Sequence, residues 1–289
     1  MKKVLLAGIM SFGLVFTCLS ANAVCDSYVC PQDVCLTSGM SRFFSHVTGQ
    51  NILAEKIAGH LIKKAIKKNV TAGDFKVDLD SYSVRDLKAG KFKSLKITGK
   101  NVNVEGIYLT ETKMETLCKY NYIKQDKKGN LTIMNDIPVS IAITVNEADL
   151  NKTMQSKDYT KMLNDINSIG GSLNIFKIDS TCIKIKKDRL YYVMKFAIPF
   201  VRGTQDVIVT TDLKVKDGQI VFANAEMLNN RSALDLSKLS KILNYVNPLD
   251  FSLKILENKD ADIKVNNVNI EDGKILIDGR MTILKDTQQ

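Results

Sequence analysis

The sequence contains no tryptophan, only two histidines and only four prolines among its 289 residues. The histidines, His46 and His60, fall fourteen residues apart in one predicted helix. They would be separated by about 21 Å along its axis and cannot bind one metal ion together. No proline- or serine-rich linker divides the chain, and after residue 23 no apolar run reaches the roughly 20 residues that a transmembrane helix needs.

The motifs of several common enzyme classes are also absent. The sequence has no G-x-S-x-G, H-E-x-x-H, P-loop or G-x-G-x-x-G pattern. Asp78 and Asp80 alternate along a predicted strand, without the spacing of an EF-hand calcium loop. We therefore predict no catalytic residues, no metal site and no cofactor, and we expect that the protein is not an enzyme.

The composition is that of a globular and basic protein. With 45% hydrophobic and 25% charged residues, the chain can bury a substantial core and is typical of a soluble protein. Its formal charge of +10 suits anionic lipid head groups, acidic glycans or nucleic acid. Nucleic acid is disfavoured, because no motif interleaves lysine with aromatic residues and because we expect the protein to be exported.

Residues 1–23 have the features of a secretory signal peptide. Lys2 and Lys3 precede an apolar run from residue 4 to residue 19, and small residues in an A-x-A pattern end at Ala23. We predict cleavage after Ala23 and a periplasmic or cell-envelope location. Removal of the two lysines would lower the formal charge from +10 to +8.

Lipid attachment at a cysteine is an alternative interpretation of the same region. Cys18 and Cys25 lie near the predicted cleavage point, but Thr17 and Val24 precede them where a small residue is expected. Cleavage by an ordinary signal peptidase is therefore the favoured prediction.

Five cysteines would remain after cleavage: Cys25, Cys30, Cys35, Cys118 and Cys182. An exported chain can oxidise them, and we predict a disulfide between Cys118 and Cys182, with one further pair among the first three. The odd count leaves at least one thiol free or paired elsewhere. Zinc binding by the first three is the alternative, although their spacing is not C-x2-C and no histidine is close.

The periodicity of the apolar residues divides the chain. Residues 24–41 are predicted to form an irregular leader, and residues 42–289 a single domain. Residues 42–68 show the three- and four-residue spacing of a long amphipathic helix of roughly 40 Å. Four lysines suit the negative end of its dipole and are candidates to face a membrane: Lys63, Lys64, Lys67 and Lys68.

From residue 75 onward the apolar period is mostly two, which predicts antiparallel strands with one buried face. Asp-Gly pairs in "VKDGQIVF" and "IEDGKILI" predict tight hairpins, and another hairpin is expected near Asp188. Shorter helices are predicted over residues 158–169 and 236–246. The fold class is α+β: a long amphipathic helix wrapped by a strongly curved antiparallel meander sheet, with two shorter helices.

Four segments in a fixed order resemble the LmeA-like phospholipid-binding family: "DLKAGKFKSLKITGKNVNVEGIYLTETKMET", "LKVKDGQIVF", "LNYVNPLDFSLKI" and "NVNIEDGKILIDG". The resemblance covers about residues 45–284. It implies an exported protein that holds phospholipid and serves the cell envelope. It also implies kinship with tubular lipid-binding (BPI/SMP-like) folds, in which a curved sheet wraps a long helix and leaves an apolar groove. No catalytic residues come with the family.

Apolar residues on two predicted helices are the candidates to line such a groove: Leu53, Ile57, Leu61, Leu239, Ile242, Leu243 and Val246. An ordinary sealed core is the alternative interpretation of the same residues. Two functions follow. The first is a carrier or sensor of phospholipid that approaches an anionic membrane surface. The second is a non-catalytic structural or adhesive envelope protein that binds a protein partner or an acidic glycan.

Overall fold

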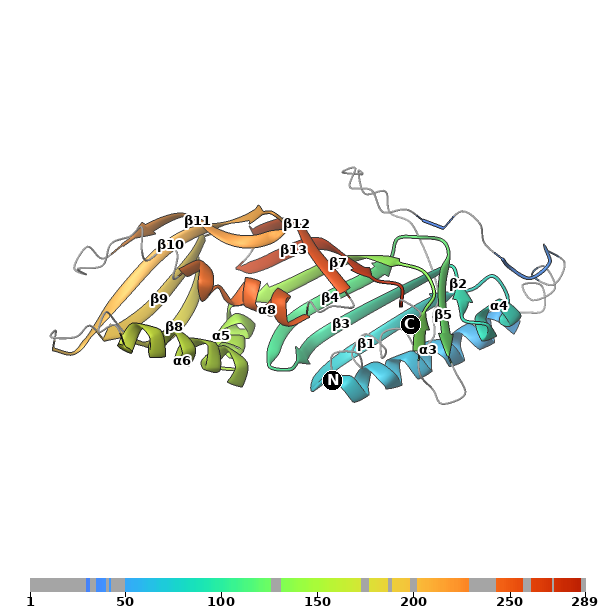
Figure 1. The fold of residues 1–289 in the computed structure, drawn as a ribbon, viewed down its shortest axis with the longest axis horizontal. Coiled ribbons are helices and arrows are strands. Elements are labelled where there is room, and N and C mark those ends of the chain that lie inside the picture. Colours follow the sequence, from blue (N-terminus) through green and yellow to red (C-terminus); the bar gives the residue numbers. More distant parts are fainter. Residues whose placement is uncertain are drawn as a thin grey trace.

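The structure is a computed structural model, which describes residues 30–31, 35–39, 42, 50–125, 131–172, 177–186, 189–197, 202–228, 243–256, 261–271 and 273–286. Its strands pair antiparallel in three sheets, and the two larger sheets form two halves that lie end to end (Figure 1). The predicted α+β class and the antiparallel pairing are therefore confirmed.

A six-stranded sheet forms the first half. In spatial order its strands are β1 (Ala72–Asp80), β3 (Ser94–Val104), β4 (Ile107–Thr116), β7 (Ile137–Asn146), β13 (Lys274–Ile283) and β12 (Ala261–Glu271). The last hairpin of the chain thus completes a sheet begun by residues 72–146. Ile277 pairs with Ile143, and both side chains are buried because the apolar residues of each strand alternate onto one face.

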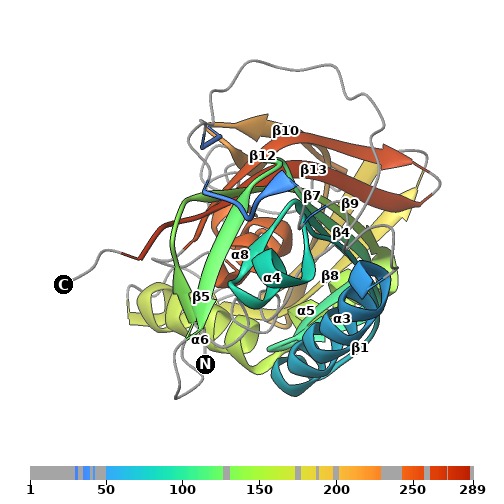
Figure 2. The same cartoon turned by 90° about the vertical axis from the view of Figure 1, so that its right-hand side faces the viewer.

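The long helix lies along the edge of this sheet. Helix α3 (Gln50–Asn69) packs beside β1 (Figure 2), with Ala58, Ile62 and Ile66 buried beneath it. Its opposite face is exposed, so the expected sheet wrapped around this helix is not confirmed. Residues 43–49 of the predicted helix lie outside the described residues.

A small third sheet contains β2 (Lys91–Phe92), β5 (Asn121–Gln125) and β6 (Leu131–Ile133), and the short helix α4 (Val84–Lys88) packs beside β2.

A four-stranded sheet forms the second half. Its order is β11 (Gln219–Met227), β10 (Thr204–Lys216), β9 (Arg189–Ala197) and β8 (Lys177–Lys186). Helices α5 (Glu147–Met154) and α6 (Lys157–Ser172) lie below it in Figure 1. Helix α6 confirms the helix predicted at 158–169, and β8 with β9 confirms the hairpin expected near Asp188.

Helix α5 joins the two halves through side chains that bond to both sheets. The Asn151 amide donates to the carbonyl of Ile183 on β8 at 2.8 Å, and its oxygen accepts from the Ile183 amide at 2.9 Å. On the other side, the Thr153 hydroxyl accepts from the Tyr108 amide of β4 at 2.9 Å. These bonds fix one sheet relative to the other.

The predicted Asp-Gly hairpins are both present, and the turn of one contacts a strand of the other. Asp217 and Gly218 have φ angles of 53° and 76°, as a two-residue hairpin turn requires. The Gly218 carbonyl accepts a hydrogen bond from the Val265 amide of β12 at 2.9 Å. A Cβ atom at Gly218 would lie 3.4 Å from the side chain of Lys264, an ordinary contact, so it is the positive φ angle that favours glycine here.

Helix α8 (Pro248–Leu256) was not predicted. Residues 236–242 of the helix expected at 236–246 lie outside the described residues, and residues 243–245 are helical. Pro248 ends that segment and also occupies the first position of α8. Proline is tolerated there, because the first amide of a helix needs no intrahelical partner. Helix α8 lies near the middle of the molecule, where the two sheets meet (Figure 1).

Two buried tyrosines hold the segment before α8 against the second half. The Tyr159 hydroxyl donates to the Val246 carbonyl at 2.6 Å, and it lies 2.9 Å from the Tyr192 hydroxyl, which is itself 3.3 Å from the same carbonyl. Both side chains are 0% exposed, and burial raises the pKa of each phenol. These hydroxyls therefore act as neutral hydrogen-bonding groups.

The shared carbonyl predicts non-additive stability effects. Tyr159→Phe and Tyr192→Phe should each lower the free energy of unfolding by about 1 kcal/mol, because the remaining tyrosine still donates to Val246. The double variant leaves that buried carbonyl without a donor and should lose about 3 kcal/mol. Urea denaturation of the four proteins measures this, and strictly additive losses would contradict the shared hydrogen bond.

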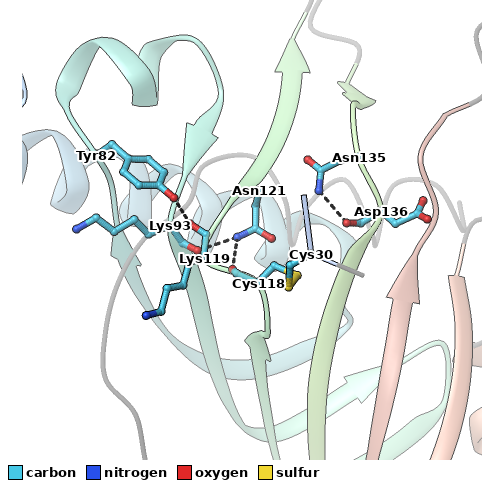
Figure 3. The surroundings of a disulfide bond; sticks show 8 residues. All are labelled: Cys30, Tyr82, Lys93, Cys118, Lys119, Asn121, Asn135 and Asp136. Atoms are coloured by element: carbon cyan, nitrogen blue, oxygen red, sulfur yellow. Dashed lines mark hydrogen bonds between the residues drawn. A yellow bond between two sulfur atoms is a disulfide. The ribbon is translucent and has the colours of Figure 1, made fainter. Parts of the chain in front are cut away.

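The predicted Cys118–Cys182 disulfide is wrong. Cys118 is bonded to Cys30 of the leader, with Cα atoms 5.5 Å apart (Figure 3). Cys182 has a free thiol. Cys118 follows β4 in the first half and Cys182 lies on β8 in the second, so their similar strand-like surroundings belong to different sheets. Cys35 is also free, which excludes its pairing with Cys30, and Cys25 lies outside the described residues.

A second attachment fixes the leader at Asp86. Thr37 donates to this carboxylate from its amide at 2.9 Å and from its hydroxyl at 2.7 Å, and Ser83 donates at 2.6 Å. Burial alone would raise the pKa of Asp86, but these hydrogen bonds and the charge of Lys91 outweigh burial and lower it. The leader is therefore bound to α4 as well as to Cys118.

Loss of the disulfide should be costly. Cys118→Ser should lower the free energy of unfolding by about 2–5 kcal/mol, because the bond closes a long loop, with a sequence separation of 88, in the unfolded chain. Cys35→Ser is the matched control, since Cys35 is exposed and unpaired, and should change stability by less than about 0.5 kcal/mol. Denaturation under non-reducing conditions compares them; equal stability of both variants would refute a structural role for the Cys30–Cys118 bond.

Candidate functional site

The candidate site is an apolar cavity of about 90 Å³ on the face of the six-stranded sheet that meets α8. Fourteen of its fifteen lining residues are apolar and the other is Thr112. No charged side chain takes part. The lining residues are Ile66, Val70, Phe75, Ile97, Val102, Val104, Leu109, Thr112, Met114, Ile141, Ile143, Leu253, Leu256, Ile263 and Met281.

Strands β3 and β4 supply the floor of the cavity. In both strands the regular alternation of side chains between the two faces of the sheet is interrupted once, at neighbouring positions. Ile97 and Val102 are five positions apart, so regular alternation would place them on opposite faces, yet both line the cavity. Asn101, with a φ of 50°, reverses the side-chain direction between them. On β4 the same change falls between Leu109 and Thr112, and the pairing register of the two strands is unbroken.

Gly99 makes room for an aromatic ring in this floor. A Cβ atom there would lie 2.8 Å from the Phe75 ring and 2.7 Å from the Val102 side chain, closer than carbon atoms approach. The missing side chain therefore lets Phe75 of the edge strand lie across β3 toward the cavity.

A second apolar cavity of about 20 Å³ lies beside the first. The two share three lining residues, Ile97, Met114 and Met281, and the second extends toward Phe92 and Ile283. The shared side chains thus separate two parts of one apolar trough. Methionine is unbranched and adopts many side-chain conformations, so Met114 and Met281 are the parts of this barrier that reorient most readily.

The chemistry of this site is that of hydrocarbon binding. Thr112 is the only polar residue in the lining, so the cavity offers neither a proton-transfer pair nor a charged anchor. Among the described residues, no group of three or more histidine, cysteine or acidic side chains is placed to bind a metal ion. His60 is exposed on α3, and His46 lies outside the described residues.

The structure places the predicted groove residues elsewhere. Leu53, Ile57 and Leu61 are 64%, 55% and 46% exposed on the outer face of α3 and do not line the cavity. Leu243 and Val246 are fully buried but also outside the lining, in contact with the core of the second half. Leu239 and Ile242 lie outside the described residues.

The predicted basic residues lie on the last turns of α3. Lys64, Lys67 and Lys68 are exposed, Lys63 is half-buried, and Lys67 makes a long ion pair of 3.9 Å with Asp74. Sequence reasoning missed all of the lining, because it assigned the groove to other residues, on helices. The signal was present in the alternating apolar residues of 95–114 and 137–145, but alternation does not distinguish a filled face from a hollow one.

Within the described residues, no helix is both long enough and apolar enough to span a bilayer. The apolar, uncharged lining of the cavity is suited to hydrocarbon ligands. The chain is a member of the LmeA-like phospholipid-binding family, whose model matches residues 49–280. This family is defined by lipid binding and is not a known enzyme class. Searches of curated proteins and of solved structures found no match.

The cavity predicts different effects on lipid binding for two substitutions at one lining position. Ile143→Phe should fill part of the hollow and reduce the phospholipid bound per protein by about fivefold or more, equivalent to about 1 kcal/mol. Ile143→Val should retain binding, because it enlarges the same space at a stability loss of about 0.5–1.5 kcal/mol. Titration with a fluorescent phospholipid measures both; if the two variants bind equally, Ile143 does not face the lipid.

Proposed function

We propose that the protein binds an acyl chain of a phospholipid in the cavity between the six-stranded sheet and α8, and that it acts in phospholipid transfer or maintenance in the cell envelope. The observation that carries this proposal is the lining itself, which is apolar at every position except Thr112. All lining residues except Met281 lie within the span matched by the phospholipid-binding family.

The size of the cavity defines what binding requires. A volume of about 90 Å³ holds roughly three groups of the size of a water molecule, whereas pockets for larger ligands measure about 300–1,000 Å³. An acyl chain must therefore widen the trough. Reorientation of Met114 and Met281 would join the two cavities, and the joined trough follows the strands from Leu109 to Thr116 on β4. That span is about 23 Å, longer than the roughly 15 Å of a lipid tail in a bilayer leaflet.

The energetics favour exchange without an energy source. Each methylene removed from water gains about 0.8 kcal/mol, and it gains a similar amount in a bilayer or in an apolar cavity. Movement of a lipid between membrane and protein therefore exchanges one apolar environment for another. A protein with such a cavity needs access to a membrane but no nucleotide.

Export is the second part of the proposal. It is supported by the signal-like residues 1–23 and by the Cys30–Cys118 disulfide, since structural disulfides form in oxidising compartments. We therefore propose a periplasmic or cell-envelope location. Tagging of the full chain and fractionation of the producing cells would locate it directly.

Native mass spectrometry of the purified chain, followed by lipid extraction, tests the binding function. We expect a protein species heavier by the mass of one phospholipid, which disappears after delipidation and returns on incubation with vesicles. A chain that never carries lipid but binds an acidic glycan would overturn the proposal in favour of a structural or adhesive role.

A further inference from the structure

The outer face of α3 carries an exposed aliphatic row. Leu53, Ile57 and Leu61 recur every four residues, so they lie one above another along the helix. Ile52 is also exposed, at 58%. Four of the seven large exposed apolar residues in the described part of the chain are on this helix. Isolated exposed aliphatic residues are ordinary, but a row on one helix indicates a surface that is covered in use.

The helix that presents this row is firmly attached to the fold. Ile62 and Ile66 on its inner face are 0% and 2% exposed, and Ile66 lines the apolar cavity. Glu55 accepts hydrogen bonds from the Ser81 amide at 3.3 Å and from the Ser81 hydroxyl at 3.0 Å. The exposed row is therefore held in a fixed position, on the same helix that contributes Ile66 to the cavity lining.

The charges beside the row identify what covers it. Lys56, Lys63 and Lys67 follow the spacing of one helix face next to the aliphatic row, and Lys64 and Lys68 extend it at the C-terminal end. Glu55 is the only acidic residue of α3, and it bonds inward to Ser81. A helix with an aliphatic row, lysines along its flank and no outward acid matches a helix lying in the plane of an anionic bilayer.

We propose that α3 is a membrane-docking helix, which inserts Leu53, Ile57 and Leu61 into the surface of an anionic phospholipid bilayer while its lysines contact the head groups. The inference extends the proposed function, since it explains how the cavity comes to a membrane. It stands on a different surface, because these three side chains do not line the cavity. Docking requires no bound lipid.

Vesicle flotation tests the docking surface with the full mature chain. We expect binding to vesicles of phosphatidylcholine and phosphatidylserine, and weak binding to phosphatidylcholine alone. The variant Leu53→Gln/Ile57→Gln/Leu61→Gln should weaken binding by about a hundredfold. Lys64→Gln and Lys68→Gln should each weaken vesicle binding by about fivefold. Binding should also be lost at high salt, because salt screens the attraction between the lysines and the anionic head groups. Unchanged binding of the triple variant would overturn the proposal.

The matched control uses exposed leucines elsewhere. Leu228 and Leu284 are 54% and 43% exposed but lie outside α3, so Leu228→Gln/Leu284→Gln should bind vesicles normally. Native mass spectrometry of the triple variant separates the two proposals: lipid retention should persist while docking is lost. Conversion of a dimer to a monomer by the triple variant, without any change in vesicle binding, would instead identify the row as an interface between two copies and refute docking.

A fluorescence experiment reports insertion directly. The chain has no tryptophan, so Leu53→Trp introduces a single indole on the proposed membrane face. Its emission should shift to the blue on addition of anionic vesicles, whereas the emission of a Leu284→Trp control should stay unchanged. Identical responses at the two positions would exclude α3 as the inserting element.

Discussion

The pairing of β13 with β7 is the constraint on which the rest of the structure depends. The register runs without interruption from Lys274 opposite Asn146 to Ile283 opposite Ile137. It places the last hairpin of the chain beside strands formed early in the sequence, and so brings Ile263 and Met281 to the same hollow as residues of β3 and β4. Without this pairing the six-stranded sheet would end at β7 and the cavity would lack one wall.

The two halves of the molecule solve different packing problems. The four-stranded half buries large side chains, among them Tyr192, Met194 and Phe196, and the hydroxyls of Tyr159 and Tyr192 donate to the Val246 carbonyl just before α8. The six-stranded half keeps a cavity whose lining includes a single polar residue, Thr112. A dry apolar hollow forfeits packing contacts that a filled core would make, and binding of hydrocarbon would restore them. Helix α3 lies between this cavity and the solvent: its inner face carries Ile66, which lines the cavity, and its outer face carries the exposed row that begins at Leu53.

Local features were predicted well where a few neighbouring residues decide the conformation. The Asp217-Gly218 turn follows from positive φ angles that few residues other than glycine tolerate, and helix α6 from its apolar spacing. The prediction of a Cys118–Cys182 disulfide was wrong, because similar strand-like surroundings do not reveal which sheet each strand joins. Helix α8 was missed because proline is uncommon inside helices, although Pro248 occupies the first turn, where proline is tolerated.

The sequence by itself determined the α+β class, the antiparallel hairpins and the membership of a phospholipid-binding family, because hydrophobic periodicity, turn residues and the order of short motifs are properties of the chain alone. Only the tertiary structure decided which apolar residues line the cavity, which lie in the packed core and which are exposed to solvent. Leu53 and Ile66 are indistinguishable as aliphatic residues of one amphipathic helix, yet one is 64% exposed and the other lines a cavity. That difference arises because α3 packs one face against β1 and leaves the opposite face exposed.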